Sequence, residues 1–246
     1  MNAQTSETII VTGAAQGIGQ AITLRLLHEG CAVLATDQNE DGLAALKELV
    51  GNDDRLSTFA FDVTDFAAVS DFFETLGKEQ PLPYGLVNNA GIFLGTKFLD
   101  YSPAEINKLL QVNLFGPIYM TQFFGKVLMP EKQPGVIVNI ASIAGQIGSS
   151  DAIYGVSKAA VIGLTKTAAM SFAPHIRVNA VAPGIVDTDM MKVVAKERIE
   201  QFRRGELLKT PILAEDIADT VWFLLSPQSK HYTGAGLDIN NGFNLR

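Results

Sequence analysis

Short runs of apolar residues alternate along this chain with longer segments whose apolar residues recur at helical spacing. The apolar runs predict buried strands at residues 8–12, 31–36, 56–61, 85–87, 136–140, 176–181 and 236–240. The segments between them predict one helix that ends near residue 29 and others at 40–50, 65–78, 103–129, 152–172 and 214–225. Strands that alternate with helices in this way form a parallel sheet covered on both faces. We therefore expect an α/β fold with one doubly wound, seven-stranded parallel sheet, formed by residues 1–246 as a single domain.

Composition and charge disfavour several classes of protein. The chain has 246 residues, a net charge of −7 and a pI of about 5.0, which does not suit nucleic acid or an anionic membrane surface as a partner. No apolar run approaches the roughly 18 residues that a membrane helix needs, and the polar start of the chain lacks a signal-peptide pattern. The single Cys31 permits no internal disulfide, and His28, His175 and His231 are not at metal-ligand spacing. We expect a cytoplasmic protein with no metal site.

A glycine-rich turn follows the first predicted strand and opens the first helix. Its pattern over residues 13–19 is Gly-x-x-x-Gly-x-Gly, which permits a tight turn and a close approach of backbone N–H groups to a pyrophosphate. Asp37 ends the second strand 18 residues after Gly19, close to the ~20 residues at which a carboxylate would bind the adenosine ribose. A 2′-phosphate would be repelled there, and Gln16 and Gln38 are neutral. The turn therefore predicts NAD rather than NADP.

Tyr154 and Lys158 stand four residues apart on the predicted helix 152–172, so they share one helix face. A phenol has a pKa near ~10, and an ammonium within ~4–6 Å lowers it. Ser142, after the fifth strand, could hold a substrate oxygen beside the phenol. These groups suit proton transfer to or from an alcohol, although a partly buried Tyr beside a solvated Lys is the commoner reason for this spacing.

Together, these residues resemble the short-chain dehydrogenase/reductase family, which has a Rossmann-like fold, over essentially the whole chain. The resemblance rests on Thr12-Gly13-x-x-x-Gly17-x-Gly19, Asp62, Asn88-Asn89-Ala90-Gly91, Asn113, Ser142, Tyr154-x-x-x-Lys158 and Pro183-Gly184 with Thr188. It implies that Tyr154 is the general acid/base and that Lys158 lowers its pKa and holds the nicotinamide ribose. It also implies that Ser142 orients the substrate oxygen and that the main-chain carbonyl of Asn113 holds a water. The residues expected to bind the dinucleotide are Gly13, Gln16, Gly17, Ile18, Gly19, Asp37, Asp62, Val63, Asn89, Ala90, Gly91, Tyr154, Lys158, Pro183, Gly184, Val186 and Thr188.

The substrate side departs from the family pattern at one point. The interval from Ser142 to Tyr154 is one residue shorter than usual, which alters the pocket wall. The expected walls are mostly apolar, and a lid is expected at about 188–210. The expected wall residues are Ile92, Phe93, Leu94, Ile143, Gln146, Ile147 and Ile185, with Met190, Met191 and Phe202 from the lid. Arg203 and Arg204 in the lid are either solvated charges or an anchor for a carboxylate or phosphate.

We therefore expect reversible hydride transfer between NAD(H) and a small, cyclic or apolar secondary alcohol or ketone. One alternative is NADPH-dependent reduction of 3-oxoacyl-carrier protein, and another is a non-catalytic dinucleotide-binding sensor or scaffold. The resemblance also implies a homotetramer or homodimer formed through helices 103–129 and 152–172. Finally, Pro117 has no N–H for the carbonyl of Asn113, four residues back, and we hypothesise that it keeps that carbonyl free.

Overall fold

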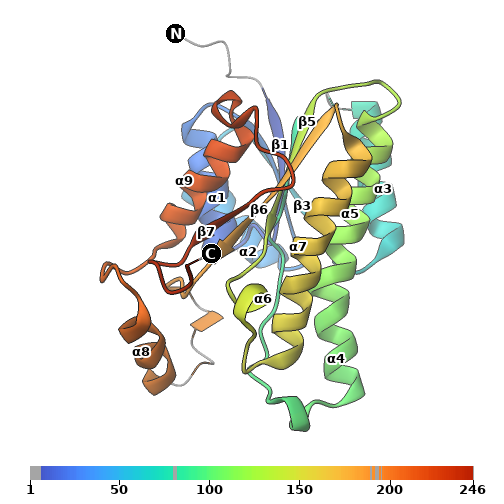
Figure 1. Cartoon of the computed structure of the whole chain (residues 1–246). Coiled ribbons are helices and arrows are strands. Elements are labelled where there is room, and N and C mark those ends of the chain that lie inside the picture. The colour runs from blue at the N-terminus through green and yellow to red at the C-terminus, as the bar shows by residue number, and fades with distance from the viewer. Residues whose placement is uncertain (1–6, 80–81, 189, 192–193, 195, 246) are drawn as a thin grey trace.

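The seven-stranded parallel sheet is confirmed by a computed structural model, which describes residues 7–79, 82–188, 190, 191, 194 and 196–245. The strands are β1 (Thr8–Thr12), β2 (Ala32–Asp37), β3 (Leu56–Ala60), β4 (Gly85–Asn88), β5 (Gly135–Ile140), β6 (Ile176–Pro183) and β7 (Gly236–Ile239). Their order is β3-β2-β1-β4-β5-β6-β7, and all neighbouring pairs are parallel (Figure 1). The direction of strand addition reverses between β1 and β4, and ligands of such sheets bind beyond the strand ends at this point.

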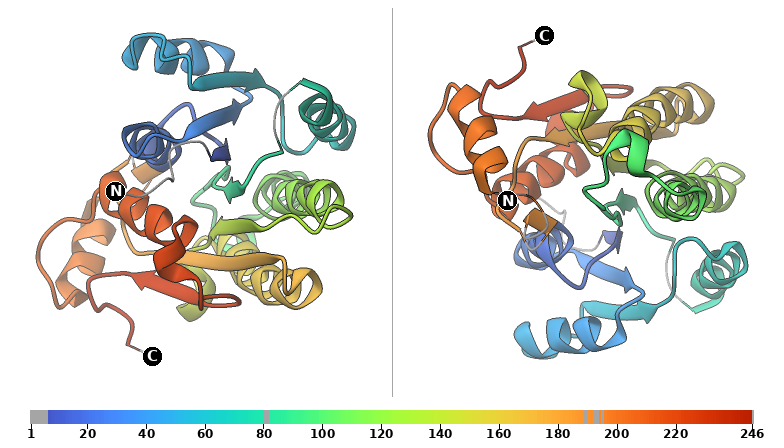
Figure 2. Two further views of the ribbon diagram at one scale, coloured as in Figure 1. Left: turned by 90° about the horizontal axis from the view of Figure 1, so that it is seen from above. Right: turned by 90° about the horizontal axis from the view of Figure 1, so that it is seen from below.

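Helices cover both faces of the sheet (Figure 2). They are α1 (Gly17–His28), α2 (Glu40–Leu49), α3 (Phe66–Glu79), α4 (Pro103–Leu110), α5 (Gly116–Leu128), α6 (Ala144–Ile147), α7 (Ala152–Phe172), α8 (Lys196–Gly205) and α9 (Ala214–Leu225). Ile9 and Val11 of β1 pack in one cluster with α1, α2 and α9, while Ile10 packs in another with α3, α5 and α7. Successive residues of a strand face opposite sides, so a continuous apolar run supplies both layers.

Local sequence signals set several helix ends. Ser102 and Glu105 form a reciprocal capping box at the start of α4, with Pro103 in the first turn. The side chain of Asp151 accepts the N–H of Tyr154 and caps α7. These caps explain why both helices begin where the sequence predicts. The short helix α6, by contrast, was not predicted.

The helix expected over 103–129 contains a widened turn. Residues Gln111–Phe115 form a π-helical segment, η2, between α4 and α5. There the N–H of Gly116 donates to the carbonyl of Gln111, five residues back. Turns of this kind are frequent at functional sites, and this one contains Asn113.

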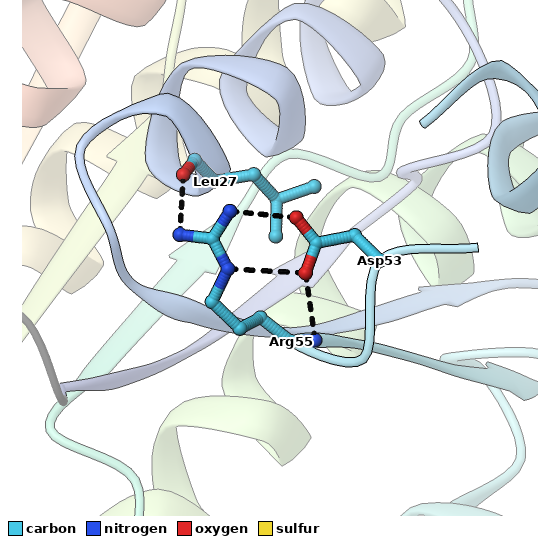
Figure 3. A network of polar contacts seen from close by, with 3 residues as sticks. All are labelled: Leu27, Asp53 and Arg55. Atoms are coloured by element: carbon cyan, nitrogen blue, oxygen red, sulfur yellow. Dashed lines mark hydrogen bonds and ion pairs between the residues drawn. The ribbon is translucent and has the colours of Figure 1, made fainter. Parts of the chain in front are cut away.

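At the β3 edge of the sheet, Arg55 links the beginning of β3 to the end of α1 (Figure 3). Its guanidinium binds both carboxylate oxygens of Asp53, at 3.0 and 2.6 Å, and donates to the Leu27 carbonyl at 2.9 Å. A cation at the last carbonyls of a helix is favourably placed. Among the described residues, no helix is both long and apolar enough to cross a membrane.

Candidate active site

The loops at the carboxyl ends of the strands line one cleft. Its lining includes every residue predicted to bind the dinucleotide except Gly19, together with the catalytic candidate Ser142. These residues come from the segments at the ends of β1 to β6, from the first turn of α1 and from the first two turns of α7. Parallel strands bring their carboxyl ends to the same edge, which explains how motifs far apart in sequence meet here.

The glycine turn is shaped by close backbone contacts. Gly13 and Gly17 have φ of +63° and +57°, and a Cβ on Gly13 would lie 2.8 Å from the Cα of Ala90. A Cβ on Gly19 would lie 2.0 Å from the carbonyl oxygen of Gly13. Gly19 therefore lets α1 pack against the turn, and its predicted part in binding the dinucleotide stays a prediction. Asn89 also supports the turn, because its Nδ2 donates to the Gly13 carbonyl at 3.0 Å.

Asp37 lines the cleft, and two backbone N–H groups bind its carboxylate. Its Oδ2 accepts the N–H of Ala15 at 3.0 Å, and its Oδ1 accepts the N–H of Asn39 at 3.0 Å. A carboxylate offers about four acceptor positions. The Asp37 side chain can therefore orient the glycine turn and still accept hydrogen bonds from a pair of hydroxyls.

Burial dominates the electrostatics of Tyr154 and Lys158. Lys158 is 5% exposed, and burial lowers its pKa to about 8. Tyr154 is partly exposed as a residue, but its phenol oxygen lies among protein atoms, and burial raises its pKa to about 12. A hydrogen bond with Ser142 acts to lower the Tyr154 pKa, and the charge of Asp151 acts to raise it.

Burial raises the Tyr154 pKa in this arrangement, and the expected lowering of that pKa by Lys158 stays a prediction. The Nζ of Lys158 donates to the carbonyl of Ile140 at 2.8 Å and lies 5.7 Å from the centre of the Tyr154 ring. The loss of hydration on burial is the largest effect on the Tyr154 pKa, and the Lys158 ammonium is bound to a backbone carbonyl.

Asn113 lies behind the cleft in the π-helical turn and is fully buried. Its Oδ1 accepts the N–H of Ile92 at 2.8 Å, and its Nδ2 donates to the Ile92 carbonyl at 2.9 Å. A Cβ on Gly91 would lie 3.4 Å from this Oδ1 and 3.5 Å from the Lys158 Nζ. The side chains of Asn113 and Lys158 thus both lie beside Gly91.

The π-helical turn also changes the reasoning about Pro117. In this register, the acceptor for an N–H at position 117 would be the carbonyl of Val112, five residues back, as well as that of Asn113 in the ordinary α register. Val112 lines the cleft, although its position gave no sequence signal beyond the nearby proline. Pro117 therefore offers no N–H to the carbonyl of Val112, a residue that lines the cleft.

The predicted substrate wall is only partly found at the cleft. Ile92, Met190 and Met191 line it. The other predicted wall residues do not: Phe93, Leu94, Ile143, Gln146, Ile147, Ile185 and Phe202.

Side-chain contacts explain two of these misses. Gln146 donates to Asp238 of β7 at 2.6 Å and accepts from Asn244 at 3.0 Å, so its side chain is bound by the C-terminal part of the chain. Phe202 of α8 stacks on Phe243, with ring centres 3.8 Å apart. Sequence spacing indicates which segment lies near the cleft, but it does not indicate which residue each side chain contacts.

Some lining residues were missed, and the predicted lid contains a separate feature. Phe61, Ile140 and Ala141 line the cleft and directly precede Asp62 or Ser142, so their place at strand ends was the available signal. Arg203 and Arg204 lie instead beside an open hollow shared with Glu200 and Lys209. Residues 189, 192, 193 and 195 of the predicted lid lie outside the described residues.

Comparison with known proteins decides the family. The family model described as "Enoyl-(Acyl carrier protein) reductase" matches residues 13–244. The 3-oxoacyl-[acyl-carrier-protein] reductase of Vibrio harveyi is 35% identical over 239 residues, which cover 95% of each protein. The chain belongs to the short-chain dehydrogenase/reductase family. It is accordingly an oxidoreductase that acts on CH–OH groups.

Two further members of the short-chain dehydrogenase/reductase family are similar over nearly their whole length. The (3R)-3-hydroxyacyl-CoA dehydrogenase of Rattus norvegicus is 36% identical over 254 residues, which cover 96% of each protein. The solved structure of 4-hydroxyisoleucine dehydrogenase complexed with NADH has a TM-score of 0.90 and 32% identity, and covers 97% of this chain and 98% of its own. The acyl-specific relatives favour the acyl alternative over the small cyclic substrate expected from the sequence.

Proposed function

We propose that this protein catalyses reversible hydride transfer between NAD(H) and carbon 3 of a 3-hydroxyacyl or 3-oxoacyl thioester. The observation that carries the proposal is the joint placement of Ser142, Tyr154, Lys158 and Asp37 along one cleft. The first three supply proton chemistry at an alcohol oxygen, and Asp37 stands where a ribose would bind. The acyl substrate is supported by the reductase of Vibrio harveyi and the rat dehydrogenase, whose names share the same C3 oxygen chemistry.

The residues of the cleft fit a nicotinamide dinucleotide. The cradle at Gly13 and Gly17 leaves no room for side chains at the first position and opens the N-terminus of α1 to a negative group. Asp37 supports NAD over NADP because a 2′-phosphate would face its carboxylate, and the neighbouring Gln38 offers no compensating charge. The solved NADH complex of 4-hydroxyisoleucine dehydrogenase, with the same fold, is consistent with this preference.

Tyr154 is the proposed proton donor in the direction of reduction. Its pKa of about 12 keeps the phenol protonated at neutral pH, so it can give its proton to the substrate oxygen. The Ser142 hydroxyl, which bonds to the phenol, would orient that oxygen and stabilise charge on it. The bound nicotinamide supplies or accepts the hydride. Lys158, with a pKa of about 8, would exchange protons with its surroundings near neutral pH.

We also propose a lid over the cleft, an assembly of identical chains and a cytoplasmic location. Met190 and Met191 line the cleft, which supports a lid over residues 188–210. An assembly of identical chains through α4–α5 and α7 is supported by the exposure of Phe115 and Val156 on these helices. A single domain located in the cytoplasm is consistent with the one continuous sheet and the absence of disulfide partners for Cys31.

A substrate and cofactor screen tests the proposal. Oxidation of NADH and of NADPH would be followed by absorbance with acetoacetyl-CoA, cyclohexanone and a short aliphatic ketone. We expect turnover with acetoacetyl-CoA and NADH. Turnover confined to the simple ketones would instead indicate a small secondary alcohol or ketone as the substrate. A preference for NADPH would refute the proposed role of Asp37 in excluding the 2′-phosphate. A blank panel together with tight NADH binding would indicate a non-catalytic binding protein.

A further inference from the structure

Asp151 lies in the shortened interval between Ser142 and Tyr154, outside both the proposed catalytic set and the cleft lining. Its side chain is 0% exposed, although aspartate is rarely fully buried unless its charge is satisfied. Its Oδ1 accepts the N–H of Tyr154 at 3.1 Å and so caps α7. A helix cap alone does not require complete burial, because helix caps commonly remain at the surface.

The other contacts of Asp151 come from the connection between β4 and α4, which runs beside α6 and the start of α7 (Figure 1). Its Oδ2 accepts the N–H groups of Leu94, at 3.0 Å, and Gly95, at 2.8 Å. The hydroxyl of Tyr101 donates to its Oδ1. Gly95 has φ of +73°, which allows two successive N–H groups to converge on one oxygen. Four donors from two segments therefore fill the acceptor positions of one carboxylate.

Phe93 lies between this anchor and a second one. On one side, the side chain of Asn113 binds both the N–H and the carbonyl of Ile92, at 2.8 and 2.9 Å. On the other side, the two N–H groups that follow Phe93 bind Asp151. The ring of Phe93 meets that of Tyr154 edge to face, with centres 5.1 Å apart and an angle of 79°. With both flanks fixed, the ring has little freedom to move away from the phenol.

We propose that Asp151 is a positioning residue that joins the connection 92–101 to the first turn of α7 and thereby fixes Phe93 and Ile92 beside the phenol of Tyr154. Ile92 lines the cleft, so a shift of this connection moves the wall next to the reacting oxygen. The inference rests on the proposed role of Tyr154 as acid/base. It places control of substrate fit in a buried carboxylate that does not touch the substrate.

The charge of Asp151 gives the proposal a second readout, which a neutral helix cap such as serine would not share. Asp151 and Lys158 are the titratable groups packed around the Tyr154 phenol among the described residues, with Tyr101 behind Asp151. After burial, which has the larger effect, the charge of Asp151 raises the Tyr154 pKa. Loss of this charge should therefore lower the pKa of the phenol.

The first test is Asp151→Ser, because Ser caps helices well but is too short to reach Leu94 and Gly95. We expect hydrogen exchange at these two amides to become at least about tenfold faster. We also expect kcat with the best substrate to fall by up to about 10²-fold, with an unchanged Kd for NADH. Unchanged exchange, or unchanged kcat, would overturn the proposal. If the parent enzyme turns over no substrate, the proposed function has failed, and the exchange measurement still decides whether Asp151 is the anchor.

The second test is Asp151→Asn, with Asp100→Asn, an exposed carboxylate in the same connection, as the matched control. In the oxidation direction, the phenolate form of Tyr154 is required. A lower pKa of Tyr154 in Asp151→Asn should shift the acid limb of the kcat profile to lower pH, while Asp100→Asn should leave the profile in place. A profile identical to that of the parent in Asp151→Asn would reduce Asp151 to a structural cap.

Discussion

Lys158 donates a hydrogen bond from its buried Nζ to the main-chain carbonyl of Ile140, 2.8 Å away. Ile140 ends β5, immediately before Ala141 and Ser142, while Lys158 projects from α7. The contact therefore joins α7, which carries Tyr154, to the strand end that precedes Ser142.

The depressed pKa of Lys158 makes stability depend on pH. The pKa falls from 10.5 to about 8 on burial, so the unfolded chain binds more protons between these values. The free energy of unfolding should therefore rise with pH through this window, and the gain is lost as pH falls below about 8. We expect the difference in unfolding free energy between the parent and Lys158→Met to rise by about 1 kcal/mol from pH 8 to pH 9.

The unfolding free energies should be compared below pH 9, because above it two other groups make the free energy of unfolding fall with pH. Burial raises the pKa of Cys31 from 9.0 to about 11 and that of Tyr154 from 10.0 to about 12. Denaturant unfolding at several pH values measures the effect. Lys166→Met, at an exposed position of α7, controls for removal of one positive charge. A difference that stays flat or falls with pH would contradict the prediction.

Tyr154→Phe removes the proposed proton donor and little else. Turnover should fall by at least about 10²-fold, because the substrate oxygen loses its acid/base group. Fluorescence titration should show that NADH still binds. Tyr232→Phe, at a partly exposed ring far along the chain, is the control and should keep full activity. Retained turnover in Tyr154→Phe would remove Tyr154 from the mechanism.

Asp37→Asn combined with Gln38→Arg should move the cofactor preference toward NADPH. The amide at position 37 retains an oxygen that can accept the N–H of Ala15, so the glycine turn should persist, while the repulsive charge is lost and a positive one is gained. We expect the ratio of kcat/KM for NADH to that for NADPH to fall at least about tenfold, which corresponds to ~1.4 kcal/mol. An unchanged ratio would show that cofactor choice lies elsewhere.

Gly19→Ala should damage both the fold and the binding of NADH. Its Cβ would lie 2.0 Å from the Gly13 oxygen, so α1 or the turn must shift. We expect a loss of several kcal/mol in urea unfolding and weaker NADH binding. Gly163→Ala is the matched control: it lies within α7 with nothing within 4 Å of the added Cβ, and should stabilise by roughly 0.5–1 kcal/mol. Equal stability of the two variants would contradict the packing role of Gly19.

Pro117→Ala restores an N–H that could bind the carbonyl of Val112 or Asn113. The π-helical turn should then tighten, which would displace Asn113 and its hydrogen bonds with Ile92. We expect a lower kcat and an altered pH–rate profile with little change in thermal stability. If both the rate and the profile match those of the parent, Pro117 has only a packing role.

Most elements of the fold follow from local sequence. The helix predicted at 152–172 is α7, and the apolar runs correspond to the seven strands within a few residues. These predictions succeed because capping residues and continuous apolar runs are local properties of the sequence. Strand order, the short helix α6 and the π-helical turn were not predicted. They depend on packing between segments that local patterns do not relate.

The sequence by itself determined the types of residues at the cleft, because residues that follow parallel strands must meet at one edge of the sheet. Tertiary structure alone decided their partners and their ionisation. Lys158 binds the carbonyl of Ile140, Gly19 packs against Gly13, and Asp151 collects donors from as far away as Leu94. Burial and hydrogen-bond geometry arise only when distant segments pack together, so the raised pKa of Tyr154 and the lowered pKa of Lys158 could not be read from residue spacing.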